Sequence, residues 1–436
     1  MDLNQRSPNS IRGGGNRKVL ETIAHSSRIY EAWSDESWVN EGAAVRVSLV
    51  CFGHRSDARL DGALVPGIHA DLTPESENSD SIDLTLARVL TENAGFVFEG
   101  LRKDGDLDVD GQTARRWMRA PNPHGRSNAE ILRPLINGID ITRRRRDGWV
   151  IDFGASMSAQ DAALYEQPFA HVLQFVKPVR EKNNDRIRRT FWWRFGRNGE
   201  QFRAAIQKVP RYINTPRVAK HRLFVWQPAA NLPDTATVAI TISDDTTFGI
   251  LHSRFHELWS LRMCTWLGVG NDPRYTPTTC FETFPFPAGL SPADTAHQQT
   301  ETLPGGEVIP ANMPTSPVRT AAEKIARAAK RLNDLRENWL NPPEWTQRVP
   351  EVIPLGMSTS PYPDRIVPKN GFEKDLAERT LTKLYNQRPA WLAAAHHDLD
   401  AAVASAYGWA DYSADLPDEE ILKRLLALNL ARAGTE

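Results

Sequence analysis

A glycine-rich turn near the amino terminus, with little regular structure around it, constrains the fold more than any other feature. The stretch NSIRGGGNRKVLETI, from Asn9 to Ile23, predicts a turn at its glycines and then a helix with Val19, Leu20 and Ile23 on one face. The residues in front of it, MDLNQRSP, are polar and unpatterned, and they predict no strand. The sequence therefore predicts an α/β element from which part of the sheet is missing.

Two further segments belong to the same α/β piece. AAVRVSLVCFG, from Ala43 to Gly53, alternates and then becomes a continuous Val/Leu run, which is typical of a buried strand. LDGALVPGIHADLT, from Leu60 to Thr73, predicts a turn and a short strand. One helix and two strands cannot close a doubly wound sheet, which needs five or more strands with helices on both faces. Either another part of a protein completes this sheet, or the α/β piece packs on the domain that follows.

The composition is that of a globular protein. Of 436 residues, 40% are hydrophobic and 25% are charged. No apolar run reaches the roughly 18 residues of a membrane span, and the amino terminus has no secretory signal pattern. The three cysteines, Cys51, Cys264 and Cys280, contain no close pair and fit neither a disulfide framework nor a zinc site. We therefore expect a reducing, cytoplasmic location.

Positive charge is concentrated in the middle of the chain. The segment from Lys177 to Arg222 contains fourteen Lys and Arg residues against three acidic ones, and TRRRRDGW lies just upstream. The segment from Asp57 to Asp110 is mainly acidic, so the net charge of −1 hides the asymmetry. A basic middle favours a surface that binds a polyanion. A solvated, Arg-rich surface helix is the alternative.

Within this basic region, aromatic and basic residues alternate in RRTFWWRFG and RYINTPRVAKHRLFVWQP. We expect most of the aromatic residues to lie in the core. The basic residues cannot all be buried, because an unpaired buried charge is too costly. Either a protein surface or a DNA backbone must receive them, and DNA is favoured. They are Arg211, Arg217, Lys220 and Arg222.

Three motifs suggest chemistry but are better explained by structure. NPPEW, from Asn341 to Trp345, resembles the loop that holds a target amine in amino-methyltransferases, yet it carries a glutamate at its fourth position and fits the end of a helix. HSRFHE places His252 and His256 four residues apart without the glutamate of a zinc protease. GVG, from Gly268 to Gly270, follows a predicted helix and fits a turn.

The remaining segments predict the domain organisation. TPESENSDS is a polar link before an α+β region, in which we expect a helix from Ser158 to Lys182 and another from Phe248 to about Leu267. A Pro/Gly/Thr-rich linker follows. The last part predicts three helical stretches: Val318 to Leu340, Lys374 to Ala404, and Asp418 to Ala433.

Taken together, several long strings resemble one family. They include NSIRGGGNRKVLETI, NGIDITRRRRDGWVIDFG, PRYINTPRVAKHRLFVW and FGILHSRFHELWSLRMCTWLGVGNDPRYTPTTCFETFPFP. In this order they are similar to class I SAM-dependent, adenine-specific DNA methyltransferases with an appended target-recognition domain, related to MmeI-like restriction–modification proteins. The resemblance runs over nearly all of residues 9–430 and concerns the C-terminal portion of such enzymes.

This resemblance implies an organisation and a function. Residues 1–72 would be the C-terminal part of the catalytic domain, an α/β remnant of a Rossmann-like methyltransferase fold. Residues 82–290 would be an α+β target-recognition domain, residues 291–317 a linker, and residues 318–436 a helical C-terminal region. The complete enzyme would transfer a methyl group from S-adenosylmethionine to adenine in DNA. The cofactor glycine motif and the Asn-Pro-Pro-aromatic loop lie upstream in the family and are absent here, so we expect no cofactor and no methylation by this chain alone.

The resemblance also implies where double-stranded DNA would bind. Residues just before the Arg-Tyr of NDPRYTP, namely Gly270 and Asp272, would lie near bases, with Arg274 and Tyr275 as an anchor. Asp272 could accept from a cytosine amine, or it could cap a turn before Pro273. Arg217, Lys220 and Arg222 are candidates for phosphate contacts. A separate N-terminal methyltransferase polypeptide is a possible partner, and the alternatives are a stand-alone DNA-specificity subunit or an inactive gene remnant.

Overall fold

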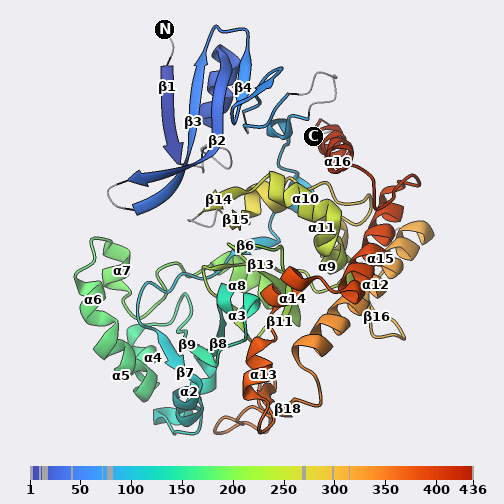
Figure 1. Ribbon diagram of the computed structural model, residues 1–436. Coiled ribbons are helices and arrows are strands. Elements are labelled where there is room, and N and C mark those ends of the chain that lie inside the picture. Colours follow the sequence, from blue (N-terminus) through green and yellow to red (C-terminus); the bar gives the residue numbers. More distant parts are fainter. Residues whose placement is uncertain are drawn as a thin grey trace.

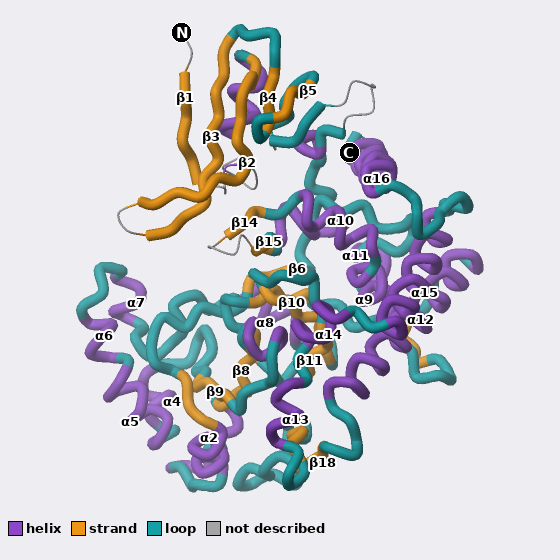
Figure 2. Tube along the Cα trace, in the orientation of Figure 1, coloured by secondary structure: helices purple, strands orange, loops and turns teal. Residues whose placement is uncertain are grey.

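The computed structural model describes residues 3–8, 11, 18–40, 43–70, 72–75, 82–267, 272–296, 299–313 and 315–434. It is a mixed α/β structure with several small sheets (Figure 1). An N-terminal sheet lies at one end, an α/β region at the other, and the C-terminal helices run along one side. Figure 2 shows that most helices of the second half gather on that side. Within the described ranges, no helix is long and apolar enough to cross a membrane.

The N-terminal sheet has five strands and one helix. Its strand order is β1-β3-β2-β4-β5. Leu20 and Ile23 of the helix α1 are buried in a small core with Val50 and Leu60 of the sheet. The elements are β1 (Leu3–Pro8), α1 (Lys18–Ser26), β2 (Arg28–Asn40), β3 (Ala43–Gly53), β4 (Ala58–Leu60) and β5 (Ala63–Val65).

The structure confirms the strand from Ala43 to Gly53 but corrects two expectations around it. The polar segment in front of the glycine turn does form a strand, because Leu3–Pro8 pairs antiparallel with β3 over six residues. Residues Arg28–Asn40, for which the sequence predicted no strand, form the other neighbour of β3. Backbone hydrogen bonds define both strands, and such bonds place little demand on side-chain type.

The next region contains two four-stranded sheets. One has the order β11-β10-β13-β6 and the other β12-β8-β9-β7. The strands are β6 (Val97–Glu99), β7 (Asp108–Asp110), β8 (Leu132–Ile136), β9 (Gly148–Ile151), β10 (Arg211–Pro216), β11 (Val225–Pro228), β12 (Leu232–Pro233) and β13 (Thr237–Ile240). The helices are α2 (Gly111–Met118), α3 (Gly138–Thr142), α4 (Ala159–Ala163), α5 (Glu166–Phe175), α6 (Lys177–Glu181), α7 (Arg186–Thr190) and α8 (Glu200–Ile206).

Three expected helical stretches are divided in the structure, and the last of them, Lys374 to Ala404, forms α13 (Glu373–Glu378), α14 (Leu381–Gln387) and α15 (Ala390–Tyr407). The segment Ser158–Lys182 forms α4, α5 and α6, and Ser158 caps α4 as expected by accepting from the amide of Asp161. The segment predicted as one helix from Phe248 forms α9 (Asp245–His252) and α10 (Arg254–Arg262), separated at Ser253, where ψ is 156°. The chain then forms a hairpin of β14 (Thr265–Leu267) and β15 (Asp272–Arg274), so the helix does not reach Leu267.

The C-terminal helices share a hydrophobic core with the α/β region. Phe248 and Leu251 of α9 pack in one cluster with Ile325 and Leu399, so the helical region expected at 318–436 has no core of its own. α16 has the predicted bounds, and α12 ends at Leu340 with Asn341 as its C-cap, as NPPEW predicted. The helices are α12 (Ser316–Leu340), α13 (Glu373–Glu378), α14 (Leu381–Gln387), α15 (Ala390–Tyr407) and α16 (Asp418–Ala433).

The segments on either side of α12 are also attached to the core. The expected linker contains α11 (Pro292–Thr295), β16 (Thr300–Thr302) and β17 (Val308–Pro310), and Asp245 accepts from the amide of Val308 at 2.7 Å. After α12, the strands β18 (Thr346–Val349) and β19 (Arg365–Pro368) pair antiparallel. The segment that joins them, residues 350–364, is called the strap. From that strap, the Tyr362 hydroxyl donates to the carbonyl of Leu132 at 2.7 Å.

Glycine at position 249 allows α9, α12 and α15 to pack closely. A Cβ at that position would lie 2.7 Å from Ile325 Cγ2 and 2.9 Å from Ala329 Cβ. We predict that Gly249→Val lowers the free energy of unfolding by about 1–3 kcal/mol through overpacking. Gly148→Val is the control, because nothing lies within 4 Å of a Cβ there. Urea unfolding measures both, and equal stabilities of the two variants would contradict this account of the packing.

Candidate nucleic-acid interface

A groove of about 570 Å³ opens where α3, the end of β10 and β15 meet. Two arginines from distant parts of the chain, Arg217 and Arg274, lie in its wall. The other lining residues are small, apolar or neutral polar: Asn137, Gly138, Ile139, Thr142, Val218, Thr235 and Ala236. A groove with this lining presents two guanidinium groups next to hydrogen-bonding side chains and a few apolar contacts.

The fold brings the two arginines together through backbone contacts. The amide of Tyr275 donates to the carbonyl of Arg217 at 2.7 Å, and Val218 forms an antiparallel bridge with Arg274. At α3, a Cβ on Gly138 would lie 3.0 Å from the carbonyl of Ala236, so a larger residue would push α3 away from the loop before β13. The position of each wall therefore follows from main-chain packing.

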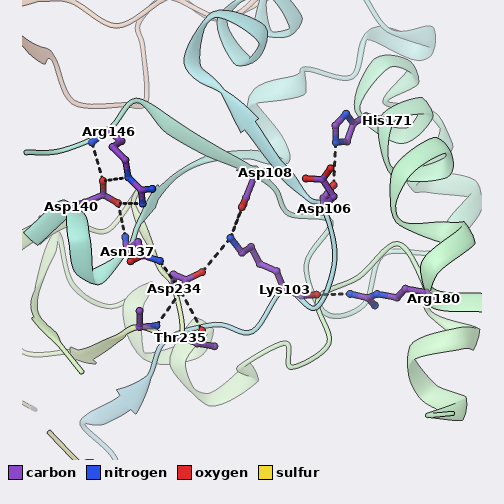
Figure 3. Close-up of polar contacts among 11 residues, drawn as sticks. Lys103, Asp106, Asp108, Asn137, Asp140, Arg146, His171, Arg180, Asp234 and Thr235 are labelled. Atoms are coloured by element: carbon purple, nitrogen blue, oxygen red, sulfur yellow. Dashed lines mark hydrogen bonds and ion pairs between the residues drawn. The ribbon is translucent and has the colours of Figure 1, made fainter. Parts of the chain in front are cut away.

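A polar network supports the groove from behind (Figure 3). Asp234 accepts from Asn137 Nδ2 at 3.3 Å and from Thr235 Oγ1 at 3.2 Å, and it forms an ion pair with Lys103 at 3.2 Å. Asp140 accepts from the amide of Asn137 at 2.8 Å and pairs with the guanidinium of Arg146 at 3.0 Å. The carboxylates of Asp234 and Asp140 are largely buried, so they orient the groove residues from within the protein.

The charge of the two groove arginines is only partly compensated. Arg217 donates to Glu99 at 2.6 Å, but Glu99 also accepts from Arg197 at 3.3 Å, so two guanidinium groups share one carboxylate. In the described part of the chain, the Arg274 guanidinium has no hydrogen bond or ion pair. The groove therefore carries excess positive charge.

Further basic residues lie on the elements beside the groove. Lys220 is exposed, and Asn386 accepts from its Nζ at 2.9 Å and lies 2.9 Å from His221 Nε2. Arg143, directly after α3, is exposed. Thr382 of α14 donates to the carbonyl of Thr142 at 2.9 Å, which attaches α14 to α3. Residues from four separate segments thus form one basic surface, which we call the groove face: Asn137–Arg143, Arg217–His221, Asp272–Arg274 and Thr382–Arg388.

Two of the predicted DNA-binding residues, the phosphate candidate Arg222 and Arg211, are paired within the protein. Arg222 is only 5% exposed, and its guanidinium donates to Ser260 Oγ at 3.1 Å and to the carbonyls of Ser260 and Pro273 at 3.3 Å. Arg211 pairs with Asp245 at 2.8 Å and stacks on Trp226 at 3.7 Å. For these two cations the favoured DNA backbone gives way to the alternative of a protein partner, because protein carbonyls, a carboxylate and an aromatic ring contact them.

The residues predicted to lie near DNA bases, or to anchor those that do, differ in burial. Tyr275 is fully buried, and its hydroxyl lies 3.1 Å from His256 Nε2, so it anchors β15 from the inside. Asp272 is half-buried at the start of β15. Gly270 lies outside the described residues, as does the GVG motif from Gly268. The structure adds Asn137, Thr142 and Thr235. The Asn-Gly helix cap in NGIDIT was a sequence signal for the first of them, whereas Thr235 had none.

His252 and His256, whose spacing resembles that of a zinc protease motif, are both buried in the core. Burial lowers the pKa of His256 to about 3, so its imidazole is neutral. Its Nδ1–H donates to the carbonyl of Leu251 at 3.1 Å, and its Nε2 accepts from Tyr275. His252 contacts the carbonyl of Phe224 and the buried Arg336, both at 2.9 Å. Both histidines therefore fix α9 and α10 behind the groove face.

Comparisons with known proteins place the fold. No protein-family model matches the sequence, and no curated protein matches it either. Among solved structures, the fold is similar to the type IIL restriction–modification enzyme MmeI in complex with DNA, with a TM-score of 0.67 and 16% sequence identity. The similarity covers 100% of this chain and 50% of that chain. This chain thus has the fold of about half of that enzyme and spans about half its length.

A buried carboxyl group accepts a hydrogen bond from the first turn of α10, the helix that carries Ser260 and His256. Asp400 accepts from the amide of Arg254 at 2.7 Å at the start of α10. Burial raises the pKa of Asp400 to about 7; the hydrogen bond from Arg254 opposes the shift, and Glu257 adds to it. Since the unfolded chain releases this proton near pH 4 and the folded chain at about 7, the stability contributed by Asp400 falls as the pH rises across that window.

We predict that Asp400→Asn removes this loss, because the amide oxygen can still cap α10 without carrying charge. Relative to the variant, the wild type should lose up to about 1.4 kcal/mol of unfolding free energy per pH unit between pH 4 and 7. Urea unfolding of both proteins at several pH values measures this difference. Parallel stability curves for the two proteins would show that Asp400 does not titrate in this window.

Proposed function

We propose that this chain is the target-recognition half of a site-specific DNA adenine-N6 methyltransferase of a restriction–modification system. One observation carries the proposal: Arg217 and Arg274 meet in a basic groove on a chain that follows, over its whole length, the fold of half of a restriction–modification enzyme solved with DNA. The groove supplies the chemistry for DNA binding. The shared fold explains why segments so distant in the sequence assemble there.

The groove face suits both kinds of DNA contact. Lys220, Arg143 and Arg217 are placed to neutralise phosphates, which supply affinity without sequence preference. Arg274, without an internal partner among the described residues, can donate two hydrogen bonds to the O6 and N7 atoms of guanine. Ile139 is 47% exposed and Val218 39% exposed in the same groove, and such apolar groups contact thymine methyls. Asp272, beside Arg274, could accept from a cytosine amine.

The N-terminal sheet supports the assignment of a methyltransferase remnant. β1 and β2 are each antiparallel to β3, so they are parallel to each other, and α1 connects them. A strand–helix–strand unit of parallel strands is the building block of Rossmann-like sheets. β3 is inserted between the two strands and adds an antiparallel member. We propose that this unit is one edge of the catalytic domain.

The described residues of this sheet do not fit a site for S-adenosylmethionine. In open α/β sheets, ligands bind at the carboxyl ends of parallel strands where the strand order reverses. Here β2 and β4 are the adjacent strands that pair in parallel, over only two residue pairs. A methyl donor must also be held close to the target amine, since orientation supplies roughly 7–11 kcal/mol in favourable cases. We therefore derive no step of methyl transfer from these residues.

We propose that the rest of the catalytic sheet joins at β1. This strand is the first in the order β1-β3-β2-β4-β5, and among the described residues its other edge has no neighbouring strand. A methyltransferase half that supplies the cofactor site could add a strand there by backbone hydrogen bonding. A separate N-terminal polypeptide is the partner that we propose for this edge.

DNA binding tests the groove face. Lys220→Ala should weaken binding to all sequences alike and reduce the slope of log affinity against log salt by about 0.9. Arg274→Ala should cost about 1–3 kcal/mol for the preferred sequence and relax specificity at one base pair. Selection from a random duplex pool, followed by fluorescence anisotropy at several salt concentrations, measures both. Lys374→Ala, an exposed lysine on α13, is the control, and a salt slope unchanged by Lys220→Ala would count against its phosphate contact.

A methylation assay tests whether methyl transfer requires a second polypeptide that carries the cofactor site. With labelled S-adenosylmethionine and duplex DNA, this chain alone should transfer no methyl group. Addition of a polypeptide with the cofactor motif and the Asn-Pro-Pro-aromatic loop should restore transfer to adenine. Transfer by this chain alone would overturn the account of its N-terminal sheet. Sequence-selective binding without restored transfer would favour a stand-alone specificity subunit.

A further inference from the structure

The helices α5, α6 and α7 expose an unusual number of apolar side chains. Figure 1 shows α6 and α7 at the edge of the α/β region, on the side toward which the hairpin of β14 and β15 also extends. Five large apolar side chains are exposed between residues 173 and 191. They are Leu173 (44%), Phe175 (45%), Val179 (65%), Ile187 (69%) and Phe191 (38%). We call this segment, Leu173–Phe191, the arm.

The arm is also strongly basic. Against Glu181 and Asp185 it carries six cationic residues, which are Lys177, Arg180, Lys182, Arg186, Arg188 and Arg189. Lys182 and Arg186 are exposed and have no hydrogen bond or ion pair with any residue that the structure describes. Arg186 is adjacent to Ile187, the most exposed of the apolar residues. The arm therefore presents apolar side chains among positive charges that are not neutralised internally.

The arm is fixed to the back of the groove by a buried arginine. Arg180 is 1% exposed, and its Nε donates to the carbonyl of Asp104 at 3.1 Å. Its guanidinium also donates to the carbonyl of Lys103, the residue whose ammonium group pairs with Asp234 behind the groove (Figure 3). Arg188 of α7 pairs with Asp104 at 3.1 Å. Residues 103–104 thus connect the arm to the groove face through a continuous set of polar contacts.

We propose that the arm is a second DNA-binding surface, which contacts duplex flanking the sequence read at the groove face. This inference rests on the proposed function. Charge complementarity selects the partner: Lys182 and Arg186 can neutralise phosphates, while Ile187 and Val179 can pack on sugars or enter a minor groove, where proteins often place apolar side chains. The rigid connection through Arg180 keeps the two surfaces at a fixed separation along the duplex.

The test compares two duplexes that carry the sequence selected by this chain. The short one contains only that sequence, and the long one has about ten further base pairs, one helical turn, on each side. The wild type should bind the long duplex more tightly. Lys182→Ala/Arg186→Ala should bind it about tenfold more weakly than the wild type and with a salt slope smaller by about 1.8, because two phosphate contacts are lost. Both proteins should bind the short duplex equally.

Two further variants separate the contributions. Ile187→Ser should weaken binding to the long duplex without changing the salt slope, since it removes an apolar contact and no charge. Arg348→Ala/Lys374→Ala removes the same charge from exposed positions on β18 and α13 and should bind both duplexes as the wild type does.

The outcomes distinguish this inference from the proposed function. If the arm variants bind the long duplex like the wild type while Arg274→Ala loses affinity, the arm does not contact DNA, although the groove does. Equal wild-type affinity for the two duplexes would also overturn the inference. If the wild type binds neither duplex, both the inference and the proposed function fail.

Discussion

The buried guanidinium of Arg222 holds the groove face together. A buried charged group is stable only if hydrogen-bond acceptors surround it. The Arg222 guanidinium donates to the hydroxyl and carbonyl of Ser260 in α10 and to the carbonyl of Pro273 in β15. The loop after β10, the helix α10 and the strand β15 are therefore fixed to a common point. Arg217, on the loop after β10, and Arg274, on β15, both line the groove. The groove face thus depends on a cation that does not itself reach the surface.

Sequence patterns predicted the elements whose apolar residues are regularly spaced. β3 and α16 have the expected bounds, and α12 differs only at its first residues, because their apolar spacing is regular. β1 was missed because its residues are polar and its pairing with β3 is made by the backbone. The division between α9 and α10 was missed because both halves are apolar and Ser253 is a weak breaking signal.

Only part of the candidate site was predictable, because a sequence shows which residues are cations but does not show which of them are buried. Arg217, Lys220 and Arg274 are recognisable as cations, and the structure places Arg217 and Arg274 in one groove, with an exposed Lys220 on the same loop as Arg217. Cations that reach the surface and cations that are buried look alike in a sequence, so Arg211 and Arg222 were grouped with them. Asn137, Thr142 and Thr235 carry no charge, and only the folded arrangement brings them to the same groove. Long-range contacts decide which polar residues share a surface.

The composition of β1 bears on how readily copies of this chain associate with one another. An uncovered strand edge invites identical chains to associate through their backbones, and proteins commonly discourage this with charge and with proline. β1 reads LNQRSP, with an arginine in its middle and a proline at its end, and has little of the β-branched character that promotes self-association. A strand of this composition is a poor template for copies of itself.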